Sequence, residues 1–206
     1  MTKVRDVLIL TAITLISGFL LGGVYELTKD PIARQQIEAN AEAYRAVCPG
    51  AESFKNDDTL DDKVEDSGSL LEGSELDLGN VTVDDALYAY DSSDNLVGMI
   101  IKTTSKDGYG GNISLAVGIR EENGSILVSG IDYLEINETA GLGMKATEED
   151  FKNQFKDKSV ESFEVTQSGA VEENQIDALS GATFTSNAVT NAVNTAIYFA
   201  RESALK

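Results

Sequence analysis

The feature that most constrains this chain is an uncharged apolar run near its N-terminus, VLILTAITLISGFLLGGVY, from Val7 to Tyr25. As an α-helix this run would be roughly 28 Å long, enough to cross the hydrocarbon core of a bilayer. A cleaved signal peptide has a shorter apolar region and a small-x-small cleavage site, whereas this run continues directly into ELTKDP. The sequence therefore favours an uncleaved transmembrane anchor over residues 7–25, within a segment 1–29, and leaves a cleaved signal as the alternative.

The charges on either side of this run do not decide its orientation. Lys3 and Arg5 precede it, and Lys29 and Arg34 follow it. The short leader makes a cytoplasmic N-terminus the simpler topology. We therefore expect a single-pass protein of the cell membrane, with its large domain on the extracytoplasmic side.

Missing residue types exclude several kinds of chemistry. The 206 residues include no histidine, no tryptophan and one cysteine, Cys48, which we expect to be a small apolar residue near a helix end. A Ser-His-Asp triad, a c-type haem and a Cys/His metal site built from this chain alone are excluded. Beyond these exclusions, the sequence singles out no catalytic residue and no metal ligand. The net charge of −19 argues against nucleic acid as a partner. Redox work by this chain would need an organic cofactor or one supplied by a neighbour.

The segments that follow the anchor differ in composition. Asp30 and Pro31 are typical of a helix N-cap and first helical residue, which predicts a connecting helix over 30–50. Residues 51–85 are rich in Asp, Glu, Ser and Gly. We interpret this stretch as an acidic, partly flexible surface segment, with docking to a basic partner protein as a second possibility.

The remainder, residues 86–206, has the pattern of an α+β domain with a mainly antiparallel sheet and flanking helices. Alternating apolar stretches predict strands at 86–90, 96–104, 113–120, 125–136 and 162–167, with a hairpin turn at Asn123-Gly124. Thr147 and Asp150 resemble a capping box that begins a short helix. The final helix carries a continuous apolar stripe, made of Val189, Ala192, Val193, Ala196, Ile197 and Ala200.

Small residues and hydroxyls are crowded just before this final helix, in the stretch DALSGATFTSNAVTNAV from residue 177 to 193. The unpaired amides at a helix N-terminus attract an anion, above all a phosphate, and Gly181 and Ala182 would let it approach the backbone. The hydroxyls of Ser180, Thr183 and Thr185 are equally typical of helix caps. From the residues alone, both interpretations remain open.

The exact order of residues in this stretch favours the phosphate-binding interpretation. Residues 177–183, DALSGAT, resemble the flavinylation motif D-x-x-[ST]-G-A-T of the FMN-binding domain family. In that family a flavin transferase joins the phosphate of FMN to the hydroxyl of the last threonine. The resemblance implies covalent FMN on Thr183, with Thr185 as a rival attachment point. Because a threonine hydroxyl is a poor nucleophile and no histidine is present to activate it, an external transferase is the natural route.

Two further stretches carry the same resemblance. ETAGLG, residues 138–143, is similar to an E-T-P-G-L-G loop of the family, with Ala140 in place of the proline, and GYGG, residues 108–111, is similar to a glycine-aromatic stretch. The resemblance implies hydrogen-bonding, apolar and close-approach roles around the flavin. Tyr109 would stack on the flavin or pack in the core, and Lys145 would place a cation near the phosphate. The implied cofactor-binding residues are Thr183, Ser180, Gly181, Ala182, Thr185, Glu138, Thr139, Gly141, Leu142, Gly143, Lys145, Tyr109 and Gly110.

The family includes the G subunit of the Rnf ion-translocating electron-transport complex and the C subunit of the sodium-pumping NADH:quinone oxidoreductase. The length of this chain fits the former better. The resemblance thus implies an electron-transfer flavoprotein subunit of a complex that couples ferredoxin:NAD electron transfer to Na⁺ or H⁺ translocation. Its partners would be the other membrane and peripheral subunits and the flavin transferase. The alternatives are the quinone-reducing complex, a free-standing anchored flavin carrier, or a non-redox tethered binding module.

Overall fold

The computed structural model describes residues 2–122 and 124–204, and the chain divides into two units, Met1–Ala41 and Glu42–Lys206. The described residues of the first unit, 2–41, belong to one helix, α1, which runs from Thr2 to Val47 and ends in the second unit. The expected helix start at Asp30 and Pro31 is wrong, because the backbone is helical through both residues. A proline inside a helix forfeits one backbone hydrogen bond, and the neighbouring turns of a long helix can carry that loss.

The first unit exposes many apolar side chains. Large apolar residues are exposed around the helix, at Val7, Leu8, Ile9, Leu10, Ile13, Leu15, Ile16, Phe19, Leu20 and Leu21. Within the residues whose side chains the structure describes, no helix combines the length and the hydropathy that a bilayer crossing requires.

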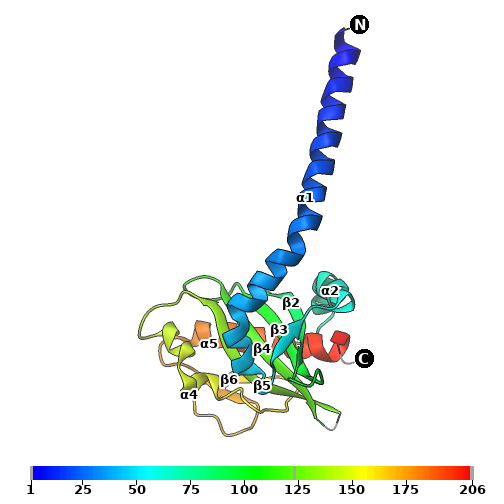
Figure 1. Cartoon of the computed structure of the whole chain (residues 1–206). Coiled ribbons are helices and arrows are strands. Elements are labelled where there is room, and N and C mark those ends of the chain that lie inside the picture. The colour runs from blue at the N-terminus through cyan, green and yellow to red at the C-terminus, as the bar shows by residue number, and fades with distance from the viewer. Residues whose placement is uncertain (1, 123, 205–206) are drawn as a thin grey trace. The chain divides into compact units, whose positions relative to one another are not determined.

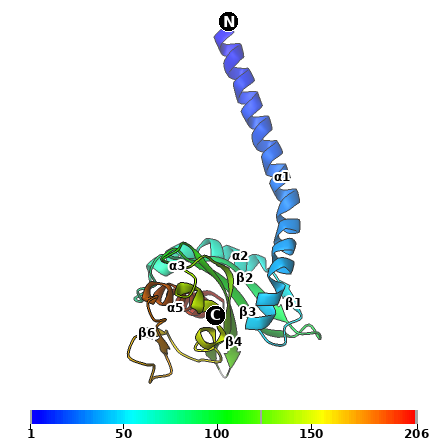
Figure 2. The same ribbon diagram turned by 90° about the vertical axis from the view of Figure 1, so that its left-hand side faces the viewer.

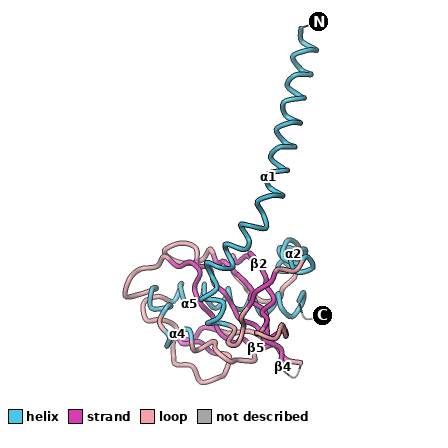
Figure 3. The backbone as a smooth tube through the Cα atoms, in the orientation of Figure 1, coloured by secondary structure: helices cyan, strands magenta, loops and turns pink. Residues whose placement is uncertain are grey.

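The second unit is built on a five-stranded antiparallel sheet (Figures 1 and 3). The strands follow one another across the sheet in chain order, so each pairs with its neighbours in sequence. They are β1 (Ser53–Lys55), β2 (Val81–Tyr90), β3 (Leu96–Ser105), β4 (Ile113–Glu122) and β5 (Ser125–Ile136). The predicted α+β class and mainly antiparallel sheet are confirmed. Asn123 of the predicted hairpin turn lies outside the described residues, and Gly124 has a φ of 79°.

Helices and a second, small sheet complete this unit. The helical elements are α2 (Asp58–Glu65), α3 (Ser67–Glu72), the 3₁₀-helix η1 (Gly143–Thr147), α4 (Glu149–Lys152), α5 (Thr183–Phe199) and the π-helix η2 (Ala200–Ala204). The second sheet pairs β6 (Glu164–Thr166) with β7 (Gln175–Asp177) in parallel. The strand predicted at 162–167 is confirmed as β6, whereas β7 was not predicted.

The predicted capping box at the start of α4 is wrong. The N-cap of α4 is Glu148, and no side chain caps the helix there. Thr147 instead donates its hydroxyl to the carbonyl oxygen of Met144, at 2.9 Å. The hydroxyl is used within η1, and it is therefore unavailable to the helix that follows.

The acidic segment 51–85 contains helices and strands that its composition alone did not predict. It contains β1, α2, α3 and the first half of β2. Leu60 is fully buried and fixes α2 on the core, and Val64, one turn later, packs against the same core. Asp57 caps α2 by accepting a hydrogen bond from the Thr59 amide at 2.9 Å. Acidic side chains thus cover the outer side of helices whose few apolar residues face inward.

Strand β2 begins at Val81, before the predicted position 86. The prediction missed this start because a bulge interrupts the alternation of buried and exposed side chains along the strand. The register shifts between Val83 and Asp85, so that Asp84 is left exposed. Asp85 then forms an ion pair with Lys102 of β3, at 3.4 Å. Burial raises the pKa of Asp85, and the attraction of Lys102 opposes this rise.

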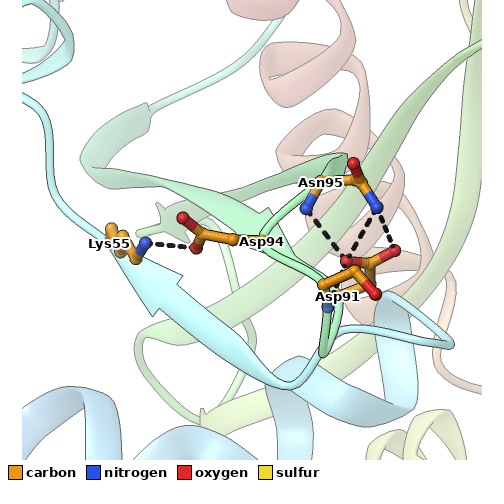
Figure 4. A network of polar contacts seen from close by, with 5 residues as sticks. Lys55, Asp91, Asp94 and Asn95 are labelled. Carbon is orange, nitrogen blue, oxygen red and sulfur yellow. Dashed lines mark hydrogen bonds and ion pairs between the residues drawn. The ribbon is translucent and has the colours of Figure 1, made fainter.

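A tight polar turn joins β2 to β3 (Figure 4). The Asp91 carboxylate accepts hydrogen bonds from the side chain of Asn95 and from the backbone amides of Ser93 and Asn95, and these bonds lower its pKa. The next acid, Asp94, has a φ of 62° and pairs with Lys55 of the edge strand β1 at 2.6 Å. The turn therefore also ties β1 to the hairpin.

Two helices cover opposite faces of the sheet (Figure 2). Helix α5 buries its apolar stripe against one face, where its side chains join Met99, Ile101, Leu115 and Val117 in the main core. The end of α1 lies on the other face. The predicted apolar stripe of the final helix is confirmed, because all six of its residues are fully buried.

The end of α1 approaches the sheet over two glycines that are paired across β4 and β5, Gly118 and Gly130. A Cβ atom added to Gly118 would overlap the carbonyl oxygen of Val47, whereas one added to Gly130 would lie 3.5 Å from Val47 Cα, an ordinary contact. The hydroxyl of Ser129 donates to the same Val47 carbonyl at 2.5 Å. Cys48, next in the chain, is fully buried, as predicted for a small apolar residue near a helix end.

We expect Gly118→Ala to lower the free energy of unfolding by about 1–3 kcal/mol, because the new methyl group displaces the end of α1 from the sheet. Gly130→Ala is the matched control and should change it by less than about 0.5 kcal/mol. Thermal unfolding of the full-length variants, followed by circular dichroism, measures both. Equal losses in the two variants would contradict this account of the contact.

Candidate functional site

One cavity of about 370 Å³ collects the three stretches singled out in the sequence. This volume lies within the range of roughly 300–1,000 Å³ that is typical of small-molecule sites. Its lining residues are Tyr109, Glu138, Thr139, Leu142, Gly143, Gly181, Ala182, Phe184 and Thr185. Residues from three distant parts of the chain therefore share one pocket.

The topology of the sheet explains why these stretches meet. Ser105 at the end of β3 pairs with Ile113 at the start of β4, which pairs in turn with Ile136 at the end of β5. The loops 106–112 and 137–142 therefore leave the sheet at the same end. Helix α5 packs across the sheet and begins beside these loops, which brings its N-terminus to the pocket.

The two loops touch at a glycine. A Cβ atom on Gly110 would overlap the carbonyl oxygen of Asn137. Gly110 does not line the cavity, so its contribution is to let the loop that carries Tyr109 lie against the loop that carries Glu138. The predicted site residue Gly110 is thus placed next to the pocket in a supporting position.

The floor of the pocket is equally tight. A Cβ atom on Gly143 would lie 2.8 Å from both Glu138 Oε2 and Thr185 Oγ1. Glu138 Oε1 is buried and has no hydrogen-bond partner within the described part of the chain. A buried carboxylate oxygen without a partner is costly, and a ligand with an N–H or O–H donor would satisfy it.

The walls are apolar and open to solvent. Tyr109 and Phe184 are 77% and 72% exposed, and Leu142 is also exposed. Of the two roles expected for Tyr109, packing in the core is wrong, because the ring stands at the mouth of the pocket. Sequence reasoning did not single out Phe184. The available signal was its position directly after Thr183, the last residue of the motif, and before the rival hydroxyl of Thr185.

The three hydroxyls before α5 occupy different surroundings. Thr183 is the first residue of α5, half-buried and outside the cavity lining, and its Oγ1 accepts a hydrogen bond from Gln167 Nε2 at 3.4 Å. Thr185 is 1% exposed and lines the floor. Ser180 is exposed and lies outside the lining. Gln167 is a second neighbour of the site that sequence reasoning missed.

None of these hydroxyls caps the helix, so the capping interpretation is wrong. The N-cap is Ala182, and among the residues that the structure describes no side-chain hydrogen bond caps the helix there. The hydroxyl of Ser186 closes the preceding turn instead, by accepting a hydrogen bond from the Leu179 amide at 2.9 Å. The first amides of α5 are consequently open to an external acceptor.

Two other expected site residues lie away from the cavity lining. Lys145 is exposed on η1, and Gly141 occupies the turn that precedes Leu142. The Leu142 amide donates to the Thr139 carbonyl at 3.1 Å, and Gly141 has a φ of 77°. These are the marks of a type II turn with Ala140 and Gly141 at its centre. The turn requires this glycine, and the conformation of the turn places Leu142 at the pocket.

The architecture and the pocket define a class of protein. The FMN-binding domain family matches residues 108–198, a range that contains every residue of the cavity lining. The RnfG N-terminal region matches residues 2–47, which are α1. The chain belongs to the family of G subunits of ion-translocating oxidoreductase complexes.

Relatives with that description align along most of the chain. The G subunit of the ion-translocating oxidoreductase complex of Methanosarcina acetivorans is 32% identical over 95% of this chain and 92% of its own. The G subunit of the Na⁺-translocating ferredoxin:NAD⁺ oxidoreductase complex of Acetobacterium woodii is 31% identical over 92% and 87%. The proton-translocating counterpart of Clostridium ljungdahlii is 29% identical over 91% and 86%.

The turn at Ala140 gives a test of the loop geometry. Proline is favoured at the first central position of a type II turn, and the Ala140 amide makes no backbone hydrogen bond within the described residues. We expect Ala140→Pro to raise the free energy of unfolding by about 0.4–1 kcal/mol, because it restricts the unfolded chain. Gly141→Ala should lower it, since φ there is positive. Denaturant unfolding of both variants checks the pair, and a destabilised Ala140→Pro would rule out the type II turn.

Proposed function

We propose that this chain is the FMN-carrying electron-transfer subunit of a membrane-associated, ion-translocating ferredoxin:NAD oxidoreductase complex. The observation that carries the proposal is the single cavity formed by the glycine-aromatic stretch, the Glu-Thr loop and the start of α5. The names of the relatives support the complex and its reaction. The sequence has no G-x-G-x-x-G after a strand, so NAD would react on another subunit.

The residues present fit a flavin. An isoalloxazine ring is flat and largely apolar and carries a ring N–H, which suits a pocket walled by Tyr109, Leu142 and Phe184. The unpartnered Glu138 Oε1 is available to accept from that N–H. The uncapped first turn of α5 offers amides to a phosphate.

When bound, FMN supplies electron transfer in steps of one or two electrons. The work of this chain is to hold and orient the cofactor. Glu138 would hold the ring through a hydrogen bond to its unpartnered oxygen, and Gly143 leaves Glu138 and Thr185 in place because any side chain there would meet both. No residue of the pocket needs to act as an acid, base or nucleophile.

The attachment point that we propose is Thr183, through a phosphoester made by a flavin transferase. Thr183 is half-buried on the first turn of α5, next to the open amides. Its rival Thr185 is 1% exposed, so a transferase would have no access to its hydroxyl. Thr183 therefore combines access for the transferase with proximity to the pocket.

The proposed attachment is tested by co-expressing the chain with a flavin transferase. We expect a fluorescent band on a denaturing gel, a mass increase of one FMN, and complete loss of both in Thr183→Val. Ser180→Ala is the matched control within the same motif and should remain labelled, while Thr183→Ser keeps the hydroxyl and should retain part of the label. Label that persists in Thr183→Val would exclude Thr183 as the attachment point.

We also propose that residues 7–25 anchor the chain in the membrane, with a cytoplasmic N-terminus and an extracytoplasmic flavin domain. The uncharged sequence and the exposed apolar side chains of this part of α1 support the anchor. In the co-expression experiment the fluorescent band should stay with membranes through an alkaline wash. Its release by the same wash would exclude an anchor.

A further prediction concerns the pocket carboxylate. Reduction places negative charge on a flavin, and the charge of Glu138 opposes it at short range. Glu138→Gln should therefore raise the midpoint potential of the bound flavin by about 30 mV, the equivalent of ~1.4 kcal/mol for a two-electron couple. Glu148→Gln removes the same charge from an exposed position outside the pocket and serves as the control in a potentiometric titration. Equal shifts in both variants would place Glu138 away from the ring.

A further inference from the structure

We propose that Gln167 is a positioning residue for flavin attachment to Thr183, and that Asp177 acts in the motif by holding the loop that carries Gln167. This inference rests on the proposed function, and it assigns roles to one residue outside the motif and to the first residue within it. Both side chains belong to one small part of the fold, which consists of the parallel strands β6 and β7 and the loop that joins them.

The contact with the attachment point is direct. Gln167 follows β6, and its Nε2 donates to Thr183 Oγ1 at 3.4 Å across 16 residues of sequence. The structure gives the Thr183 side chain no second hydrogen bond among the described residues. Gln167 is itself exposed, so its amide is free to follow the group that becomes attached to this oxygen.

Asp177 fixes the loop in which Gln167 lies. Its Oδ1 accepts a hydrogen bond from the Ala170 amide at 2.6 Å. The strand pairing sets Thr166 opposite Asp177, and the Ala178 amide donates to the Thr166 carbonyl at 2.8 Å. The residues immediately before and shortly after Gln167 are thus both tied to the start of the motif. The aspartate carboxylate is used as an acceptor for the loop.

The backbone of Asp177 is fixed in its own turn by Gln154. The Asp177 amide donates to Gln154 Oε1 at 2.6 Å, and Gln154 Nε2 donates to the Asp177 carbonyl at 3.5 Å. This pair of bonds connects the loop to the end of α4, whose Phe151 is buried in the main core. These bonds therefore fix the position of Gln167, and with it the contact to Thr183, relative to the core of the domain.

Hydrogen-bond donors from two elements lie near the Thr183 oxygen. The Gln167 amide lies on one side, and the uncapped amides of the first turn of α5 lie at the helix end. In the attachment step a bond forms between Thr183 Oγ1 and the phosphorus of the FMN moiety. The phosphoanhydride bond of a flavin dinucleotide breaks, its nucleotide leaves with the bonding electron pair, and the hydroxyl proton passes to a base of the transferase. The product phosphodiester keeps one negative charge, which these donors stabilise.

A donor that stabilises developing charge on the phosphate accelerates the transfer. Gln167→Leu, which has a similar size and no donor, should slow labelling about tenfold at saturating transferase, the rate equivalent of one hydrogen bond to a charged group. Gln167→Glu should be slower still, because its charge repels the phosphate. Gln167→Lys restores a donor and should recover most of the rate.

The experiment uses the full chain, expressed without transferase and purified in detergent, with a purified flavin transferase and a flavin dinucleotide as the probe. The initial rate of fluorescent labelling is measured for each variant, beside its thermal unfolding midpoint. Ser168→Ala in the same loop is the matched control and should label at the wild-type rate. If Gln167 had only a structural role, its substitutions would lower the thermal unfolding midpoint. The labelling rates of the Lys, Leu and Glu variants would then not follow the charge of the new side chain.

Two substitutions distinguish a loop-holding role of Asp177 from a role of its charge. Asp177→Asn keeps an oxygen that can accept from the Ala170 amide and should label within about twofold of wild type, whereas Asp177→Ala should label as slowly as Gln167→Leu. If the asparagine variant is as slow as the alanine variant, the carboxylate charge is what matters and the loop-holding role is wrong.

Different results would overturn the proposed function and the positioning role of Gln167. Absence of label on the wild-type chain would overturn the proposed function itself. Normal labelling of Thr183 in wild type together with wild-type rates in Gln167→Leu and Gln167→Glu would overturn only the positioning role.

Discussion

The packing of α5 against the sheet is the interaction on which the site depends. The side chains of α5 that face the sheet are mostly small, and residues such as Ala188, Ala192 and Ala196 are fully buried. Small residues allow the helix to approach the strands closely, and burial of the whole stripe fixes its axial position. The N-terminus of α5 is thereby held at the end of the sheet from which the two loops emerge. If the helix shifted along its axis, the floor formed by Thr185 and Gly143 would open.

Features encoded by local periodicity could be predicted from the sequence. Strand β5 begins and ends where its alternating residues do, and the final helix is evident from its stripe. The acidic segment could not be predicted in the same way. Its helices present Leu60, Val64 and a few other apolar residues to the core, and the many carboxylates around them outweigh this signal in composition. Strand β7 is three residues long, too short for any periodicity to register.

The same distinction applies to the site. The motifs identify which stretches gather at the pocket, but they do not say which hydroxyl faces which way. Thr183 and Thr185 are two residues apart, a rotation of about 200° on a helix, so one faces Gln167 while the other faces the floor. Gln167 is brought to Thr183 by the parallel pairing of two short strands. Tertiary pairing of this kind leaves no mark in a single sequence.

The arrangement also separates the proposed tether from the proposed ring site. The Tyr109 and Phe184 walls of the pocket are largely exposed, so noncovalent contacts alone would hold a flavin weakly. A tether at Thr183 offsets this weakness, because a linked group is present at a high effective concentration beside its site. An open pocket is a disadvantage for an enzyme that must exclude water from its substrate. For a carrier that passes electrons to another protein it is an advantage, because the edge of the cofactor stays accessible to the partner.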